Sequence, residues 1–350
     1  MTIRFFQAAI LVAVMAVAGS TETYARHRGN NPPPPPTACI PSSANRPLAQ
    51  GSQLYGVTFD DVSNVSGELD FLVNLPHMPT TRIYFDPTVS ASTYATPIKT
   101  FYPNSYIVGE VADSSDMMNF TIGSIGSWAN SLINTLGPCV DVWEVGNEIN
   151  GDWLLNNANT ATATMNKMEA VYDAVTNPTN PTSRSQLTAL TFFYEGEPSD
   201  PNNCIATDNG GNDMFTWINT NFLANPTVET EKIRNGLNYV LISWYPEQCN
   251  NMKPSWPAIF EKLASIFPNA YVGFGEIGTA NPDYGQPDEV NLINTFYPSV
   301  RNGIIWPGNT ATVSYMNSHY VGGYFWWYAA EEMVPRASSI LYPILYNAMK

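Results

Sequence analysis

Short apolar runs alternate with amphipathic stretches along most of this chain, and this alternation constrains the fold more than any other feature. Eight runs rich in Val, Ile, Tyr and Phe predict strands, beginning at Leu54, Thr81, Tyr106, Val140, Leu187, Tyr239, Ala270 and Tyr320. Helical stretches lie between them, over 66–75, 121–136, 160–176, 212–224, 255–266, 286–300 and 337–349. Continuous apolar runs are typical of strands buried on both faces, as in a parallel sheet. Eight strand-then-helix units predict an α/β fold, a single (β/α)8 TIM barrel over 51–350.

Two other architectures fit a chain of 350 residues. One is a pair of average domains, and the other is a doubly wound α/β sheet. A doubly wound nucleotide-binding sheet would carry G-x-G-x-x-G after its first strand or a P-loop. The sequence has neither motif at that place, so the doubly wound sheet is only the alternative to the barrel.

The N-terminus has the pattern of a secretory signal peptide. Arg4 precedes an apolar run over 5–18, which is too short to span a bilayer comfortably. Ala16-Val17-Ala18 and Thr23-Tyr24-Ala25 offer two candidate cleavage sites. We expect 1–25 to be a signal peptide and the protein to be secreted, to the extracellular space or the periplasm. An uncleaved membrane anchor is the alternative.

A stiff segment follows the predicted signal peptide. Five consecutive prolines occupy 32–36, and such a run adopts extended polyproline II without a core of its own. We therefore expect 26–50 to be a Pro-rich linker or an N-terminal arm, and 51–350 to be the catalytic domain.

The charge balance excludes some partners. The chain has 15 Lys and Arg against 30 Asp and Glu, a net charge of −15, which disfavours nucleic acids and anionic membranes. Charged residues make up only 13% of the chain, whereas it contains 9 Trp, 19 Tyr and 16 Phe. This composition suits a neutral, ring-shaped ligand, although aromatic residues also fill the cores of large α/β domains.

Four cysteines predict two disulfides in an oxidising compartment, with three connectivities open from the count alone. Cys204 and Cys249 follow the fifth and sixth predicted strands, and Cys39 and Cys139 precede the first and fourth. These positions favour the pairs Cys204–Cys249 and Cys39–Cys139. There is no C-x-x-C motif and no histidine cluster, so we expect no metal and no cofactor.

Two predicted strands carry a glutamate at the C-terminal end: Glu148 in VWEVGNEIN and Glu276 in YVGFGEIGT. Packing seldom explains such a position, because burying an unpaired charge costs several kcal/mol. In a barrel both glutamates would lie at the same end of the strands. Glycoside hydrolysis requires such a pair, one carboxyl as acid and one as nucleophile or base. Taken singly, each glutamate could instead be a surface or capping acid.

Neighbouring residues support this pair. Asn147 offers an amide to a substrate hydroxyl, Arg82 could keep Glu276 ionised through a bidentate contact, and Tyr245 could donate a hydrogen bond to the same carboxylate. The alternatives are an ion pair of Arg82 with an acid such as Asp86 and ordinary packing of Tyr245. A paired carboxylate also pushes the pKa of its partner upward, which suits Glu148 as the acid.

Other acids and aromatic residues compete for these roles. A pyranose presents an apolar face to an aromatic ring, and four tryptophans are candidates for such stacking: Trp153, Trp244, Trp326 and Trp327. We expect two of the four to belong to the core instead. Four further glutamates lie near strand ends: Glu144, Glu195, Glu197 and Glu247. Glu144 precedes Glu148 by four residues, so the two lie on the same face of the predicted strand. We therefore expect Glu144 inside the barrel, paired with a cation or a polar group.

The segments TRIYFDP, VWEVGNEINGDW, ISWYP, GFGEIGT and GGYFWWY occur in the order found in clan A glycoside hydrolases, and the chain resembles that clan over about 55–349. The resemblance implies a retaining (β/α)8 enzyme with Glu148 as acid/base and Glu276 as nucleophile. It also implies that Asn147 contacts the sugar 2-hydroxyl, that Arg82 and Tyr245 support the nucleophile, and that Trp326 or Trp327 floors the −1 subsite.

The sequence departs from the cellulase-type families of the clan, which usually carry histidines at the ends of strands 3 and 6. Here Glu110 and Ser243 lie near those ends. The segments R-x-x-x-D-P, GNEINGDW and S-W-Y-P are more similar to endo-β-1,4-galactanases and related endo-glycanases. At the level of single families, the resemblance to endo-β-1,4-galactanases and to cellulase- and mannanase-type families is loose. We expect a secreted, monomeric, retaining endo-β-glycanase with a polysaccharide or oligosaccharide substrate. The alternatives are an exo-acting β-glycosidase and a carbohydrate-binding barrel without catalysis.

Overall fold

The structure, a computed structural model, describes Cys39 and residues 48–154, 160–178, 186–200, 203–205, 213–279, 287–298 and 318–350. The predicted signal peptide and, apart from Cys39, residues 26–47 of the predicted linker lie outside the described residues. None of the described helices combines the length and the apolar character that a membrane crossing requires.

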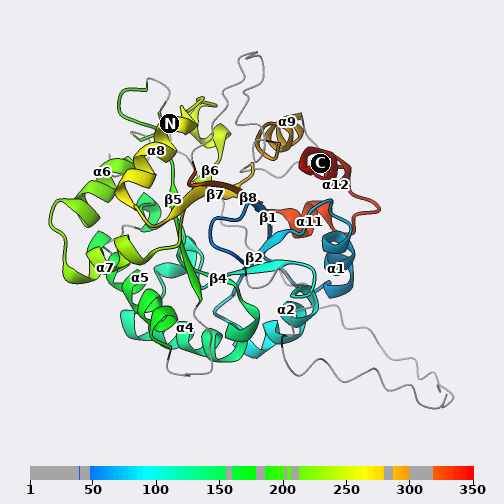
Figure 1. The fold of residues 1–350 in the computed structure, drawn as a ribbon, viewed down its shortest axis with the longest axis horizontal. Coiled ribbons are helices and arrows are strands. Elements are labelled where there is room, and N and C mark those ends of the chain that lie inside the picture. Colours follow the sequence, from blue (N-terminus) through cyan, green and yellow to red (C-terminus); the bar gives the residue numbers. More distant parts are fainter. Residues whose placement is uncertain are drawn as a thin grey trace, which may run out of the picture. The chain divides into compact units, whose positions relative to one another are not determined.

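Eight parallel strands close into a barrel, each hydrogen-bonded to its neighbours in chain order (Figure 1). The strands are β1 Leu54–Phe59, β2 Thr80–Tyr84, β3 Tyr106–Glu110, β4 Val142–Gly146, β5 Leu187–Phe193, β6 Tyr239–Trp244, β7 Tyr271–Ile277 and β8 Tyr320–Trp326. All eight predicted strands are confirmed, and with them the single (β/α)8 barrel. The doubly wound sheet is wrong, because β1 pairs with β8 and leaves no open edge.

Helices surround the barrel (Figure 1). They are α1 Val65–Val73, α2 Ala95–Phe101, α3 Ser114–Met117, α4 Ile122–Leu136, α5 Ala161–Thr176, α6 Met214–Ile218, α7 Val228–Gly236, α8 Trp256–Ile266, α9 Pro287–Phe296, α11 Ala329–Met333 and α12 Leu341–Met349. Each predicted helical stretch overlaps one of them. None of the predicted helical stretches covers α2, α3, α7 or α11.

Two layers of apolar side chains build the barrel. One cluster joins the outer faces of the strands to the helices. A smaller one fills the barrel interior toward the N-terminal ends of the strands, with Val108 and Val142 among its members. Side chains two residues apart share a strand face, so Glu110 and Glu144 lie on the same face as Val108 and Val142, nearer the C-terminal ends. Glu110 is paired in register with Glu144.

Two disulfides fix loops at the two ends of the barrel. Cys39 is bonded to Cys139, with 5.4 Å between the Cα atoms. Cys204 is bonded to Cys249, with a Cα–Cα distance of 4.9 Å. Both bonds are the pairs that the strand order favoured.

Candidate active site

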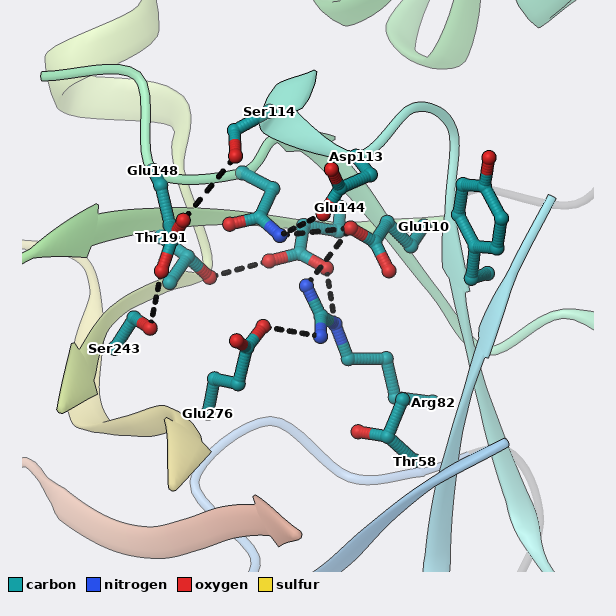
Figure 2. Close-up of polar contacts among 12 residues, drawn as sticks. Thr58, Arg82, Glu110, Asp113, Ser114, Glu144, Glu148, Thr191, Ser243 and Glu276 are labelled. Carbon is teal, nitrogen blue, oxygen red and sulfur yellow. Dashed lines mark hydrogen bonds and ion pairs between the residues drawn. The ribbon is translucent and has the colours of Figure 1, made fainter. Parts of the chain in front are cut away.

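Glu148 lies just past the end of β4 in a left-handed backbone conformation, with φ +46°. L-residues other than Gly, Asn and Asp seldom adopt this region, so the turn places the side chain at some conformational cost. The residue is 8% exposed. Its Oε1 accepts a hydrogen bond from the Ser243 hydroxyl of β6, and its Oε2 accepts one of 3.2 Å from the Ser114 hydroxyl of α3 (Figure 2).

Glu276 reaches the same region from β7 and is 5% exposed. Its Oε2 lies 2.7 Å from Nη1 of Arg82, and its Oε1 accepts a hydrogen bond from the Tyr245 hydroxyl. A register shift between β6 and β7 sets Glu276 opposite Ser243, the residue that binds Glu148. The structure therefore brings together the two glutamates from strands distant in sequence, at the C-terminal end of the barrel.

Arg82 contacts three carboxylates at once (Figure 2). Its Nε lies 2.7 Å from Glu144, its Nη2 2.9 Å from Glu110 and its Nη1 2.7 Å from Glu276. The guanidinium is 1% exposed. The expected contact with Glu276 is present, but it is a single hydrogen bond rather than a bidentate one, because the other nitrogens bind Glu144 and Glu110. The expectation for Glu144 is confirmed, and the Thr191 hydroxyl also donates to it.

The two glutamates differ in electrostatic surroundings. Burial raises the pKa of Glu148 well above its usual range, and the nearby charge of Glu276 raises it further. Burial also raises the pKa of Glu276, but Arg82 and the Tyr245 hydrogen bond oppose that rise. Glu148 is therefore the carboxyl that keeps a proton, and Glu276 the one that ionises more readily.

The Asn147 amide is held in one orientation. Its Nδ2 donates to Glu110 Oε1 at 2.8 Å and to Asp113 Oδ2 at 3.4 Å. The side chain is 1% exposed, and its Oδ1 has no hydrogen-bond partner. Because both acids accept from the NH2 group, the carbonyl oxygen is the end of the amide left for a ligand.

The four candidate tryptophans divide into two pairs. Trp153 is half-buried and donates its Nε1–H to Ser114, the residue that binds Glu148. Trp327 is half-buried, with its ring centroid 5.2 Å from the Arg82 guanidinium carbon. Trp244 and Trp326 are 0% exposed and belong to the outer core. The assignment of these two to substrate binding is wrong, because a completely buried ring offers no face to a sugar.

The rival acids lie elsewhere. Glu195 lies two residues past the end of β5, beside the second disulfide, where its carbonyl oxygen accepts a hydrogen bond from the Cys204 N–H. Glu197 is half-buried on the same loop, and Glu247 is exposed in the turn after β6. The contributions of Ser114 and Ser243 to the site were not predicted, and Glu110 was predicted only as a departure from a histidine pattern. The signal for Glu110 and Ser243 was their position at strand ends.

Among the described residues, no group of three or more His, Cys, Asp or Glu side chains could hold a metal ion.

No protein-family model matches the sequence, and no curated protein matches it. Among solved structures, Saccharomyces cerevisiae Gas2p in complex with laminaritriose and laminaritetraose is 14% identical with a TM-score of 0.50, covering 85% of this chain. This chain spans only 64% of that structure. A Thermotoga maritima beta-glucosidase in complex with deoxynojirimycin is 11% identical, with a TM-score of 0.49; the match covers 80% of this chain and 88% of that structure. The Ignisphaera aggregans GH53 catalytic domain is 12% identical, with a TM-score of 0.45; the match covers 81% of this chain and 87% of that structure. The likeness to Gas2p shows the barrel fold.

Proposed function

We propose that this chain is a secreted, monomeric, retaining endo-β-glycanase. The observation that supports it most is the electrostatic difference between two buried glutamates in one site, Glu148 with a strongly raised pKa and Glu276 beside Arg82 and Tyr245. A retaining mechanism needs one protonated carboxyl and one ionised carboxylate. The fold that Gas2p uses to hold laminaritriose and laminaritetraose is consistent with a carbohydrate ligand here.

The proposed reaction has two steps. Glu276 attacks the anomeric carbon while Glu148 gives its proton to the glycosidic oxygen, which leaves as an alcohol. A covalent glycosyl-enzyme on Glu276 results, and Glu148 is now ionised. It then takes a proton from water, whose oxygen displaces Glu276 and restores both groups. Trp153 and Trp327 are half-buried rings that can stack on the sugar.

A panel of polysaccharides and aryl β-glycosides tests this proposal. We expect reducing ends to appear from at least one β-linked polysaccharide, with a ladder of oligosaccharides early in the reaction. Activity confined to small glycosides would instead support an exo-acting β-glycosidase. Tight binding of a polysaccharide without any release would support the inactive carbohydrate-binding barrel and contradict the enzyme.

Ser243 tunes the proposed acid, and its removal should move the pH profile. The Ser243 hydrogen bond favours the ionised form of Glu148 and lowers its pKa. Replacing Ser243 by Ala therefore raises that pKa further. Because the acid must hold its proton, activity is lost as pH rises through this pKa. We expect the basic limb of kcat/KM against pH to shift to higher pH in the variant.

The matched control is Ser127→Ala, which alters an exposed serine on α4. Its pH profile should coincide with that of the wild type. A basic limb that moved to lower pH in Ser243→Ala would contradict the assignment, because it would mean that Ser243 stabilises the protonated carboxyl.

A further inference from the structure

Two successive hydrogen bonds connect Trp153 to the proposed acid. The Trp153 Nε1–H donates to Ser114 Oγ at 3.1 Å. The Ser114 hydroxyl in turn donates to Glu148 Oε2 at 3.2 Å (Figure 2). An indole N–H can only donate, whereas a hydroxyl has one hydrogen and two acceptor lone pairs. The chain therefore runs in one direction, from the ring through the hydroxyl to the carboxyl group.

Trp153 is packed so that its N–H meets Ser114. It lies in a short 3-10 helix, η3 (Asp152–Leu154), which packs against α3. A Cβ at Gly151 would meet the Trp153 ring at 2.5 Å, so the ring lies directly against the backbone there. Phe193 at the end of β5 makes an edge contact with the same ring, with 5.0 Å between the centroids. Packing therefore sets the place of the indole nitrogen.

Ser114 is held from the other side, because both ends of α3 are anchored. The Asp113 carboxylate caps the helix by accepting from the Ser115 N–H at 2.7 Å. At the other end, the Met117 carbonyl oxygen accepts a hydrogen bond of 2.8 Å from Nζ of Lys167 on α5. Ser114 itself is 4% exposed. Its hydroxyl is thus a fixed link between the ring and the acid.

The Ser114 hydrogen bond acts on a carboxyl group that its other surroundings mostly keep protonated. Titratable groups from three other segments lie near this carboxyl: Glu276, Asp113 and Tyr245. Burial and the two acids raise the pKa of Glu148, and the hydroxyls of Ser243 and Ser114 oppose that rise. A hydroxyl that accepts one hydrogen bond becomes a better donor, because linked hydrogen bonds polarise one another. Trp153 therefore strengthens the bond from Ser114 to the acid.

We propose, building on the retaining glycanase function above, that Trp153 is a positioning residue for the acid. Through Ser114 it fixes the orientation of the Glu148 carboxyl group and stabilises its ionised form. Glu148 becomes ionised when it gives its proton to the leaving oxygen, and it must then act as the base. The chain of hydrogen bonds thus stabilises the carboxylate that the first step forms and holds it in place for the second.

A double-mutant cycle on the pKa of Glu148 tests this proposal, with Trp153→Phe, Ser114→Ala and the double variant. Ser114→Ala should raise that pKa by about 0.5–1 pH unit, the size of one net hydrogen bond. Trp153→Phe keeps an aromatic ring but removes the N–H, so it should raise the pKa by a smaller amount. In the Ser114→Ala background it should cause no further rise, because the link is already absent.

Two measurements report this pKa. The basic limb of kcat/KM against pH on polysaccharide gives the value in the free enzyme. Carbon-13 NMR titration of labelled glutamate carboxyl groups gives it without any substrate, with the Glu148 signal identified by its loss in Glu148→Gln. On an aryl glycoside with an acidic phenol, the first step needs no proton donor. The kcat/KM of Ser114→Ala should therefore change little on that substrate.

The matched control is Trp128→Phe, which removes an indole N–H that donates to the Val111 carbonyl oxygen and should leave the pKa of Glu148 unchanged. The same shift for Trp153→Phe in both backgrounds would overturn the proposal, because the ring would then act by burial alone. An unchanged pKa in Trp153→Phe would overturn it as well. If the wild type hydrolysed no glycoside, the glycanase function would fail, and the NMR cycle would still decide whether Trp153 acts on Glu148.

Discussion

Replacing Glu276 by Ala should abolish glycoside hydrolysis on every substrate, with a loss on the order of 10⁴-fold or more in kcat. The physical reason is that no other described carboxylate has the support of both Arg82 and Tyr245, so no glycosyl-enzyme can form. Added azide can then attack the anomeric carbon only from the face that Glu276 occupied. A β-glycoside would therefore give the α-glycosyl azide.

Replacing Glu148 by Ala should give a different pattern. Loss of the proton donor slows cleavage of a polysaccharide by about 10²- to 10⁴-fold, because an alcohol leaves poorly without a proton. An aryl glycoside with an acidic phenol leaves unaided, so its first step should survive. The glycosyl-enzyme then accumulates, because no general base is left to activate water. Azide needs none, and it should rescue turnover and give the β-glycosyl azide.

Reducing-end assays, release of the phenol and NMR of the azide product measure these outcomes together. The control variant is Glu247→Ala, which changes an exposed acid outside the pair and should behave as the wild type. Exchanged product stereochemistry would exchange the roles of Glu148 and Glu276. Wild-type activity of both variants on polysaccharide would exclude them and direct attention to Glu195 and Glu197, with Glu247 already tested by the control.

The barrel could be predicted because its strands carry a local signal. Each is a short apolar run, and such runs are recognisable without tertiary information. Helix α7 lacks that signal. Its sequence VETEKIRNG is mostly polar and buries Thr230 and Ile233, and its start depends on a capping box between Thr227 and Thr230. The helix was therefore missed, although its cap was present in the sequence.

The positions of the aromatic residues depended on strand irregularities that the sequence does not reveal. Adjacent residues of a regular strand face opposite sides, so only one of Trp244 and Tyr245 could point into the barrel. The register shift between β6 and β7 obscures which one. At the end of β8, Tyr324 and Phe325 have positive φ values of 77° and 33°. Because this break interrupts the alternation of side chains, the sequence alone could not predict which of Trp326 and Trp327 faces the barrel interior.

The full set of Arg82 contacts could not be predicted from the sequence either. Its three partners come from β3, β4 and β7, and the sequence alone could place each carboxylate only at the end of its own strand. One cation among several buried acids makes Arg82 the residue whose loss the folded state should tolerate least.

Replacing Arg82 by Met should lower the free energy of unfolding at neutral pH by about 3–5 kcal/mol, the usual range when one partner of a buried ion pair is removed. Methionine fills much of the same space but leaves Glu110, Glu144 and Glu276 without a counterion. Urea denaturation followed by circular dichroism measures the change. Activity on polysaccharide should fall as well, because Glu276 loses the cation that helps it to ionise.

The loss of unfolding free energy in Arg82→Met should be smaller at acidic pH than at neutral pH. Burial raises the pKa of Glu110 and Glu276 in the folded protein, and Arg82 opposes that rise. Without Arg82 both pKa values rise further above those of the unfolded chain. A group whose pKa is higher in the folded state stabilises it below the unfolded pKa, and this contribution is lost as pH rises through the folded value. The variant should therefore be closest to the wild type in stability at acidic pH and furthest from it at neutral pH.

Arg336→Met is the matched control, because Arg336 also pairs with a carboxylate, Asp70, but at the surface. Exposed ion pairs contribute little to stability, so this variant should unfold at the same urea concentration as the wild type at every pH. The stability of Arg82→Lys should lie between that of the wild type and that of Arg82→Met. One ammonium group keeps the charge but cannot reach three carboxylates in different directions. If Arg82→Met were as stable as Arg336→Met at neutral pH, the buried carboxyls would have to be neutral in the wild type. Glu276 could not then act as the nucleophile in its resting state.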